Sequence, residues 1–317
     1  MQQLITGIHH VTATASDAQE NIDFYTGVLG LRLVKKTVNF DNKEVYHFYY
    51  SNGGSGSGSI LTFFPYQGLK NGRHGKGMLN TTTLSVDIES LDYWQQRLER
   101  FGIAFKEPKE RFRSETVIYL EDADGMGLEL VFTNRDHREG WANGIIPRSH
   151  SIKGFYSVEL WEETIERTAA LLTNQMNHVL IGQEGNRYRY AASDQPGHYV
   201  DLLATPDVLK GLPGSGAVHH IAFSTPNQET QLLIREKVER LNLDPTAVRD
   251  RNYFTSIYFR EPGGVLFEVA TAGPGFTADE TETELGQNLK LPAQFEGDRT
   301  AIEGILPVIS LEKEKFM

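Results

Sequence analysis

Two nearly identical runs near opposite ends of the chain, Ile8–Thr12 (IHHVT) and Val218–Phe223 (VHHIAF), constrain how it can fold. Both are typical of β-strands, in which successive side chains point to opposite faces, so one histidine of each pair can face a cavity. If the two strands lie side by side, one imidazole from each can meet at a single point. Two imidazoles that converge with a carboxylate are typical of a transition-metal site.

An internal repeat indicates which carboxylate could join the two imidazoles. One strand–helix–three-strand unit occurs four times, at about residues 5–65, 79–133, 152–205 and 217–271. Aligning the first strands places four residues in register, with the middle two open to a slip of one residue: His10, Thr82, Tyr156 and His220. Aligning the last strands matches a second set, 45 to 52 residues further on: Thr62, Glu129, Asp201 and Glu268. The chain therefore consists of four βαβββ modules, numbered here 1 to 4.

These modules predict an α+β fold. A single βαβββ module has a curved sheet whose concave face it cannot bury alone, so four modules should form two pairs, giving two domains. We expect modules 1 and 2 in residues 1–133, a polar, glycine-containing linker over residues 134–151, and modules 3 and 4 in residues 152–272. Residues 273–317 lie beyond the repeat and are expected to pack over one domain as a short helix and an extended segment.

Composition excludes several classes of function. The net charge of −11, from 42 acidic and 31 basic residues, argues against nucleic acid or an anionic membrane as a partner. The chain has no cysteine, so any metal must be held by histidine, carboxylate and water. No segment approaches a membrane span and the first residues do not resemble a signal peptide, so the expected location is the cytoplasm. A homo-oligomer is compatible with the composition, which does not test it.

Several segments carry a family likeness: Phe24–Gly30 (FYTGVLG), the paired histidine runs, Asp250–Phe254 (DRNYF) and Tyr258–Glu268 (YFREPGGVLFE). With the βαβββ repeats, they resemble the vicinal oxygen chelate superfamily, which includes glyoxalases, extradiol dioxygenases and some resistance proteins. Within it, essentially the whole chain resembles the hydroquinone-type ring-cleaving dioxygenases. The resemblance implies that modules 1 and 4 are neighbours, because ligands of one metal come from both, and that module 2 pairs with module 3.

The resemblance also implies which residues form the site. The metal ligands fall on His10, His220 and Glu268, and the metal is Fe(II), with Mn(II) in some members of the group. The catalytic positions of the group fall on His9, His219, Arg251 and Tyr258, and its substrate-binding positions fall on Thr12, Arg251 and Tyr258. The partners are then a small aromatic diol and O₂, since Fe(II) held by two imidazoles and one carboxylate keeps positions open for both.

Physical chemistry supports this ligand set. Glu268 lies within an apolar run, Val265–Ala270, where an unpaired carboxylate would be costly and a metal would remove the cost. Thr62 stands where glyoxalases of this fold normally have an acidic fourth ligand, which favours an oxygenase over an isomerase. Glu129 and Asp201 have no histidine on the matching strand, so we interpret them as relics or polar core residues.

Most of these residues also have plain structural interpretations. A single histidine in a strand is usually packed or exposed, and it is the two matching pairs that favour the ligand interpretation. Without the resemblance, an exposed Arg251 and a packed Tyr258 would be the better prediction. Five further histidines without repeat partners receive no role: His47, His137, His150, His178 and His198.

The sequence thus favours an Fe(II)-dependent dioxygenase that inserts O₂ into a hydroquinone- or catechol-type ring, for aromatic degradation or quinone detoxification. A glyoxalase-type metal-dependent isomerase or lyase is the second hypothesis. The third is a non-catalytic protein that binds an aromatic compound, as some resistance proteins of the superfamily do. Oxygen uptake separates them, because only the first consumes O₂. The sequence does not choose between para- and ortho-diols.

Overall fold

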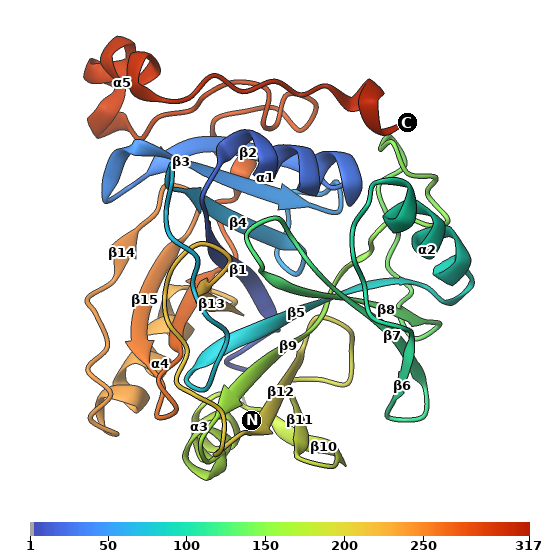
Figure 1. Ribbon diagram of the computed structural model, residues 1–317. Helices are drawn as coiled ribbons and strands as arrows, with labels where there is room; N and C mark the ends of the chain where they lie inside the picture. The colour runs from blue at the N-terminus through green and yellow to red at the C-terminus, as the bar shows by residue number, and fades with distance from the viewer. Residues whose placement is uncertain (1–2) are drawn as a thin grey trace.

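The two ends of the repeat region share one curled sheet in the computed structural model, which describes residues 3–317 (Figure 1). Its strands come from modules 1 and 4, in the spatial order β14 (Arg249–Asp250), β15 (Thr255–Arg260), β16 (Leu266–Thr271), β13 (Val218–Thr225), β1 (Ile8–Ala15), β4 (Ile60–Pro65), β3 (Asn42–Ser51) and β2 (Arg32–Asn39). A second sheet comes from modules 2 and 3, in the order β10 (Val179–Glu184), β11 (Arg187–Ala191), β12 (Tyr199–Ala204), β9 (Gly154–Glu162), β5 (Met78–Asp87), β8 (Gly127–Thr133), β7 (Glu115–Glu121) and β6 (Lys109–Arg111). The predicted α+β fold and module pairing are confirmed.

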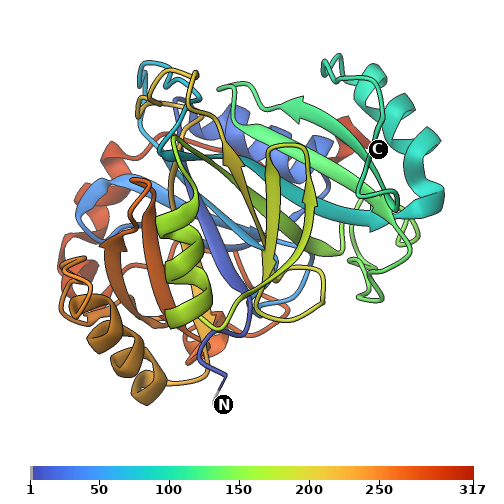
Figure 2. The same ribbon diagram turned by 90° about the horizontal axis from the view of Figure 1, so that it is seen from below.

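The modules place their helices on the outside of the sheets (Figures 1 and 2). These are α1 (Ala18–Ile22), which continues as the π-helical turn η1 (Asp23–Val28), η2 (Ile88–Ser90) with α2 (Leu91–Arg100), α3 (Glu166–Gln175) and α4 (Gln228–Glu239). Local sequence sets their starts: Asp17 accepts hydrogen bonds from the Gln19 and Glu20 amides, and Asn227 and Thr230 form a reciprocal cap on α4. No helix within residues 3–317 is both long and apolar enough to cross a membrane.

Modules 1 and 4 meet where β1 pairs with β13, and this seam fixes where the paired histidines lie. β1 runs antiparallel to β13, with Thr12 opposite His220 and His10 opposite Ala222. β16 runs parallel to β13 on its other side, which places Glu268 next to Ala222. Residues two apart on a strand share a face, so His10, His220 and Glu268 all belong to the concave face of this sheet.

The second sheet repeats this arrangement and corrects part of the alignment. Its strand pairing places Glu129 and Asp201 at the positions of Thr62 and Glu268, so the predicted last-strand register is confirmed. The first-strand register is wrong by one residue in modules 2 and 3: the equivalents of His10 and His220 are Thr81 and Ser157, not Thr82 and Tyr156. Strands β5 and β9 carry no histidine to mark the register, and their pairing has two irregularities.

Ion pairs fill the centre of the second sheet. Glu129 pairs with Arg111, and Asp201 accepts hydrogen bonds from Arg189 at 2.7 Å and from Arg187 at 2.9 Å. All these groups are largely buried, where an unpaired charge would be costly. The two acids therefore act as satisfied polar groups of the core, as the sequence interpretation allowed.

The C-terminal tail runs along the outside of module 1 (Figure 1). It contains η3 (Phe276–Ala278), η4 (Ala293–Asp298), α5 (Arg299–Ile305) and η5 (Lys313–Phe316). Its anchor is Lys35 of β2, a fully buried ammonium that donates to the Phe276 carbonyl at 3.1 Å and to Asp279 at 2.6 Å, and pairs with Glu280. Residues 134–151 form neither helix nor strand. The domain boundaries expected at these segments stay a prediction.

A buried carboxyl pair joins modules 3 and 4. Glu162, at the end of β9, is fully buried, and its carboxylate oxygens have no hydrogen-bond partner among residues 3–317. The neighbouring Glu261 accepts hydrogen bonds from the amides of Gly263 and Val265, at 2.7 Å each. Burial first, and the Glu261 carboxyl second, raise the pKa of Glu162 far above its usual value. The free energy of unfolding that is lost by burying Glu162 therefore increases as the pH rises.

We expect Glu162→Gln to stabilise the protein by about 1 to 3 kcal/mol at pH 8, because the amide is neutral without binding a proton. A folded-state pKa above the unfolded one gives stability that is present below the unfolded pKa and is lost as the pH rises. The gain should thus shrink toward pH 5 in urea unfolding. The control Glu163→Gln, at an exposed position, should change stability by less than about 0.5 kcal/mol. A pH-independent effect of Glu162→Gln would contradict this account.

Candidate metal centre

Three side chains from strands β1, β13 and β16 converge in the first sheet. The Nε2 atoms of His10 and His220 are 3.2 Å apart. The Oε2 atom of Glu268 lies 2.9 Å from the His220 Nε2 atom and 3.4 Å from the His10 Nε2 atom. All three side chains are buried. The structure thus brings together the three residues that the sequence analysis names as ligands.

The spacing of these atoms fits one metal ion. Ligand atoms about 2.1 Å from an ion and at right angles to one another are about 3 Å apart. The Oε1 atom of Glu268 accepts a hydrogen bond from Ser256, whereas its buried Oε2 atom has no hydrogen bond of good geometry within the described chain. A cation between the three atoms would satisfy this oxygen, which is otherwise costly to bury. Imidazole and carboxylate donors suit first-row divalent metals.

Local electrostatics favour the forms that coordinate a metal. Burial alone would raise the pKa of Glu268, but the imidazoles of His10 and His220 outweigh it and hold the pKa well below its usual value. Burial lowers the pKa of His220, against the opposing effect of the Glu268 carboxylate. The site therefore presents a carboxylate together with a neutral imidazole, and these are the protonation states that metals bind.

A second histidine contacts each of the two converging histidines. The Nδ1 atoms of His9 and His10 are 2.9 Å apart, and those of His219 and His220 are 2.8 Å apart. Such partners fix the orientation and tautomer of a ligand ring, here with Nε2 directed at the shared point. Burial, and then the neighbouring His10, lower the pKa of His9 to about 3, so this ring is neutral at physiological pH. The two His-His runs of the sequence therefore form two copies of one orienting contact.

A cavity of about 230 Å³ opens beside the three converging side chains. Aromatic side chains line much of it, namely Phe40, Tyr49, Phe64, Tyr66, Phe254 and Tyr258. Arg251 donates from Nε to the Tyr258 oxygen at 3.2 Å, and its Nη2 atom is 3.6 Å from an Asp41 carboxylate oxygen. The cavity thus offers apolar walls for a ring and a cationic edge for an anionic oxygen.

The other predicted site residues divide into two groups. Those that line the cavity are His219, Arg251 and Tyr258. His9 and Thr12 are outside the lining that the structure describes. His9 packs on Phe254, with ring centroids 4.9 Å apart, and the fully buried Thr12 hydroxyl is 2.8 Å from that of Thr62. The catalytic and substrate-binding roles of all five stay predictions.

Sequence reasoning missed further residues of this site. Ser256 holds one carboxylate oxygen of Glu268, and its spacing of two from Tyr258 on β15 indicates that both share a face. His47 lines the cavity although it has no repeat partner. The signal that could have found it was its spacing of two from Tyr49 on β3, in a strand rich in aromatic residues.

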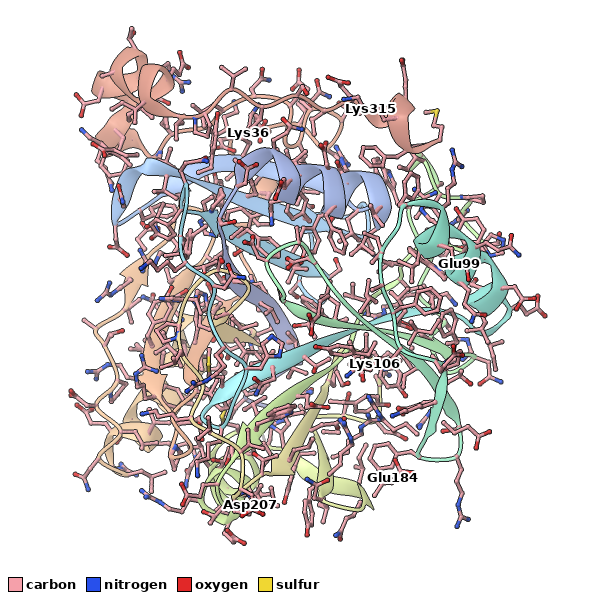
Figure 3. All side chains as sticks on the ribbon, in the orientation of Figure 1. Lys36, Glu99, Lys106, Glu184, Asp207 and Lys315 are labelled. Carbon is pink, nitrogen blue, oxygen red and sulfur yellow. The ribbon has the colours of Figure 1, made fainter. Side chains whose placement is uncertain are left out.

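The second sheet carries other residues at the equivalent positions. Thr81 and Ser157 replace the histidines, and arginines pair with the acids. A cavity of about 410 Å³ lies over this sheet, and two of its lining residues, Lys106 and Glu184, are labelled in Figure 3. Within residues 3–317, one group of three or more His, Cys, Asp or Glu side chains lies at ligating distances, and it consists of His10, His220 and Glu268.

Comparisons with known proteins establish the family. A model of the glyoxalase/bleomycin resistance protein/dioxygenase superfamily matches residues 7–130. The chain is 42% identical to a Bacillus subtilis (strain 168) protein named "Putative ring-cleaving dioxygenase MhqO", over 97% of this chain and 98% of that one. The chain belongs to the glyoxalase/bleomycin resistance protein/dioxygenase superfamily. It is also 32% identical to a Sphingobium indicum protein named "Chlorohydroquinone/hydroquinone 1,2-dioxygenase", over 94% of each chain.

Solved structures share the fold of this superfamily member. A crystal structure of a Bacillus subtilis protein, described as "putative dioxygenase", matches with a TM-score of 0.93 and 41% identity, over 98% of this chain and 99% of that one. Glyoxalase I from Zea mays matches with a TM-score of 0.61 and 13% identity, over 84% of this chain and 92% of that one. The second likeness is one of fold alone.

We expect Ser256→Ala to weaken Fe(II) binding about 10- to 100-fold, the usual effect of removing a group that orients a metal ligand. Competition with a chromophoric chelator under anaerobic conditions measures the affinity. Ser157→Ala is the matched control, because it removes a buried serine hydroxyl at the second-sheet position equivalent to His220, and it should leave the affinity unchanged. Equal affinities of the two variants would contradict the role assigned to Ser256.

Proposed function

We propose that this chain is a non-heme Fe(II)-dependent dioxygenase that inserts O₂ into the ring of a hydroquinone-type aromatic compound and opens it. The observation that carries the proposal is the triangle of His10, His220 and Glu268 beside a cavity of the size of one ring. Relatives named as ring-cleaving dioxygenases, matched over nearly the whole chain, support the reaction class. A role in aromatic degradation or quinone detoxification is part of the proposal.

In this proposal His10, His220 and Glu268 hold Fe(II), and Mn(II) is an alternative for the same donors. When bound, the ion supplies a redox centre that binds diol and O₂ together and removes the spin barrier to their reaction. Two imidazoles and one carboxylate on one side leave positions for both partners. Thr62, at the module 1 position equivalent to Glu268, adds no further ionised ligand.

The cavity suits a single ring with small substituents. A cavity of about 150 Å³ holds benzene, and this one measures about 230 Å³. Phe254 lies 5.3 Å from His10, centroid to centroid, so a ring beside the proposed ligands can pack against it. One relative is named for hydroquinones, which leads us to propose a para-diol, cleaved between a hydroxyl-bearing carbon and its neighbour.

Tyr258 and Arg251 are proposed to bind and polarise the diol. Burial, and then the Glu268 carboxylate, raise the pKa of Tyr258 against the effect of Arg251, so the side chain remains a phenol at neutral pH. Its oxygen accepts the Arg251 Nε–H, which leaves its own hydrogen available for a substrate oxygen. The guanidinium adds a positive charge that favours the phenolate form of the diol.

His219 is the proposed proton donor to an oxygen of the bound ring compound. It lines the cavity, and because its Nδ1 atom accepts the Nδ1–H of His220, its own hydrogen lies on Nε2, from which it can donate. His9 is the equivalent residue of module 1, but its ring packs on Phe254 outside the cavity lining of the described chain. We therefore assign proton movement to His219 and the orientation of His10 to His9.

The two alternative functions have weaker support. A glyoxalase-type isomerase or lyase is expected to have an acid where this chain has Thr62, and the likeness to glyoxalase I extends to the fold alone. A non-catalytic binding protein has no evident use for a buried Glu268 oxygen without a hydrogen-bond partner among residues 3–317.

The direct test is oxygen uptake by anaerobically iron-loaded protein, with hydroquinone compared with catechol. We expect one O₂ consumed per ring opened, with hydroquinone turned over faster. Glu268→Gln should abolish turnover and weaken iron binding. Asp201→Asn is the matched control at the equivalent position of the second sheet: it should lower stability, because Asp201 pairs with Arg189, and leave turnover of the folded protein unchanged. Iron binding without oxygen uptake for any diol would contradict the proposal.

Variants of His9 and His219, the histidines that contact the proposed ligands His10 and His220, should differ in one respect. His9→Gln and His219→Gln should both lower iron affinity about 10- to 100-fold, since each histidine orients a proposed ligand. At saturating iron, His9→Gln should recover most of its turnover, whereas kcat of His219→Gln should remain about 10²- to 10⁴-fold low, the usual contribution of a general acid. Iron titrations and steady-state kinetics separate the two effects. The reverse pattern would assign proton transfer to His9.

A further inference from the structure

The turn between β2 and β3 reaches the opening of the cavity in the first sheet. Asn39 and Asn42 pair across this hairpin, and Phe40 and Asp41 form the loop between them. Both loop residues line the cavity. The Asp41 side chain is 70% exposed, which places its carboxylate where the cavity meets solvent. The function proposed above assigns no task to this carboxylate.

Asp41 of module 1 faces Arg251 of module 4. Its carboxylate oxygen is 3.6 Å from the Arg251 Nη2 atom, which is too far for a hydrogen bond of good geometry. The Arg251 side chain is 14% exposed, so the positive member of the pair lies inside the cavity and the negative member faces solvent. An ion pair with an exposed member contributes little to stability, so the stability of the fold does not account for Asp41.

The charges in and beside the cavity are already balanced. Apart from its histidines, the cavity lining of the described chain has two charged side chains, Asp41 and Arg251, and their charges cancel. The phenolate form of a diol balances the one positive charge that Glu268 leaves on a divalent ion. A ring carboxylate would bring a second negative charge without a cation of the lining left to meet it, and the Asp41 carboxylate would repel it.

We propose that Asp41 determines which substrates the site accepts by charge: it neutralises Arg251 and repels anionic rings, so that para-diols with uncharged substituents are selected over those with a carboxylate. This inference rests on the proposed function and names the substrate class of the same site. The aromatic walls of the cavity can hold a ring with apolar substituents, but they do not compensate a carboxylate that leaves water.

Two ligands of similar shape isolate the effect of charge. Gentisate is a hydroquinone with one ring carboxylate, and gentisamide has an amide in its place. Both groups are planar and similar in size, so a steric limit alone would exclude both. Because their internal hydrogen bonds differ, the ratio of their dissociation constants is compared between variants, where this difference cancels.

A matched pair of variants isolates the charge in the protein. Asp41→Asn removes the charge and keeps a residue that suits a turn, since it is the backbone amide of Asp41 that donates to the Asn39 side chain. Glu44→Gln is the control, because it removes an acid from the same hairpin at an exposed position outside the cavity lining of residues 3–317.

Binding is measured anaerobically by calorimetry on protein loaded with redox-inert Zn(II). We expect the wild type to bind gentisamide at least about 10-fold more tightly than gentisate, because like charges repel. In Asp41→Asn the ratio of the gentisate to the gentisamide dissociation constant should fall about 3- to 10-fold, the usual effect of one charge near a protein surface. This change should shrink at about 1 M salt, which screens an exposed charge. Glu44→Gln should match the wild type.

The outcomes separate this inference from the proposed function. If Asp41→Asn leaves the ratio unchanged, or weakens hydroquinone, gentisamide and gentisate alike, Asp41 holds Arg251 in place without selecting charge. If hydroquinone binds and neither gentisamide nor gentisate does, shape limits the cavity. If Glu44→Gln lowers the ratio as Asp41→Asn does, the effect is one of overall surface charge. Each of these results would overturn the inference and leave the dioxygenase proposal standing. If the wild type binds no diol, both are wrong.

Discussion

The antiparallel seam between β1 and β13 is the constraint on which the rest of the structure depends. It joins the two ends of the repeat region, and its register sets His10 and His220 on one concave face. β16, beside β13, adds Glu268. Because successive residues of a strand alternate between faces, a slip of one residue along this seam would turn a histidine away from the other two groups. The candidate site is thus a consequence of module pairing.

Two sheets of the same topology bury their central acids in different ways. In the second sheet, arginines neutralise Glu129 and Asp201, and the ionic core is satisfied by protein groups. In the first, two imidazoles face Glu268, and its Oε2 atom stays without a hydrogen bond of good geometry among residues 3–317. A buried carboxylate oxygen of this kind is costly unless a cation satisfies it. This contrast within one molecule supports the first sheet as the place for a metal.

Much of the fold could be predicted, because four modules repeat one order of elements. The two matching His-His runs also indicated that a histidine from each end of the repeat region would meet, as His10 and His220 do. The first-strand alignment failed at Thr82 and Tyr156, since a polar strand without a histidine admits a slip of one residue. Ser256 and His47 were missed: their spacing of two from Tyr258 and Tyr49 indicates a shared strand face, but their contacts cross between strands and depend on which faces meet. The sequence shows periodicity along a strand, whereas these contacts require the pairing of strands.

The position of the ion in crystals of iron-loaded protein, located by anomalous scattering at the iron absorption edge, tests the metal centre most directly. The account predicts one peak per chain, about 2.0 to 2.2 Å from the Nε2 atoms of His10 and His220 and the Oε2 atom of Glu268, with no fourth protein ligand. A peak elsewhere in the chain, or one that a fourth side chain coordinates, would contradict it.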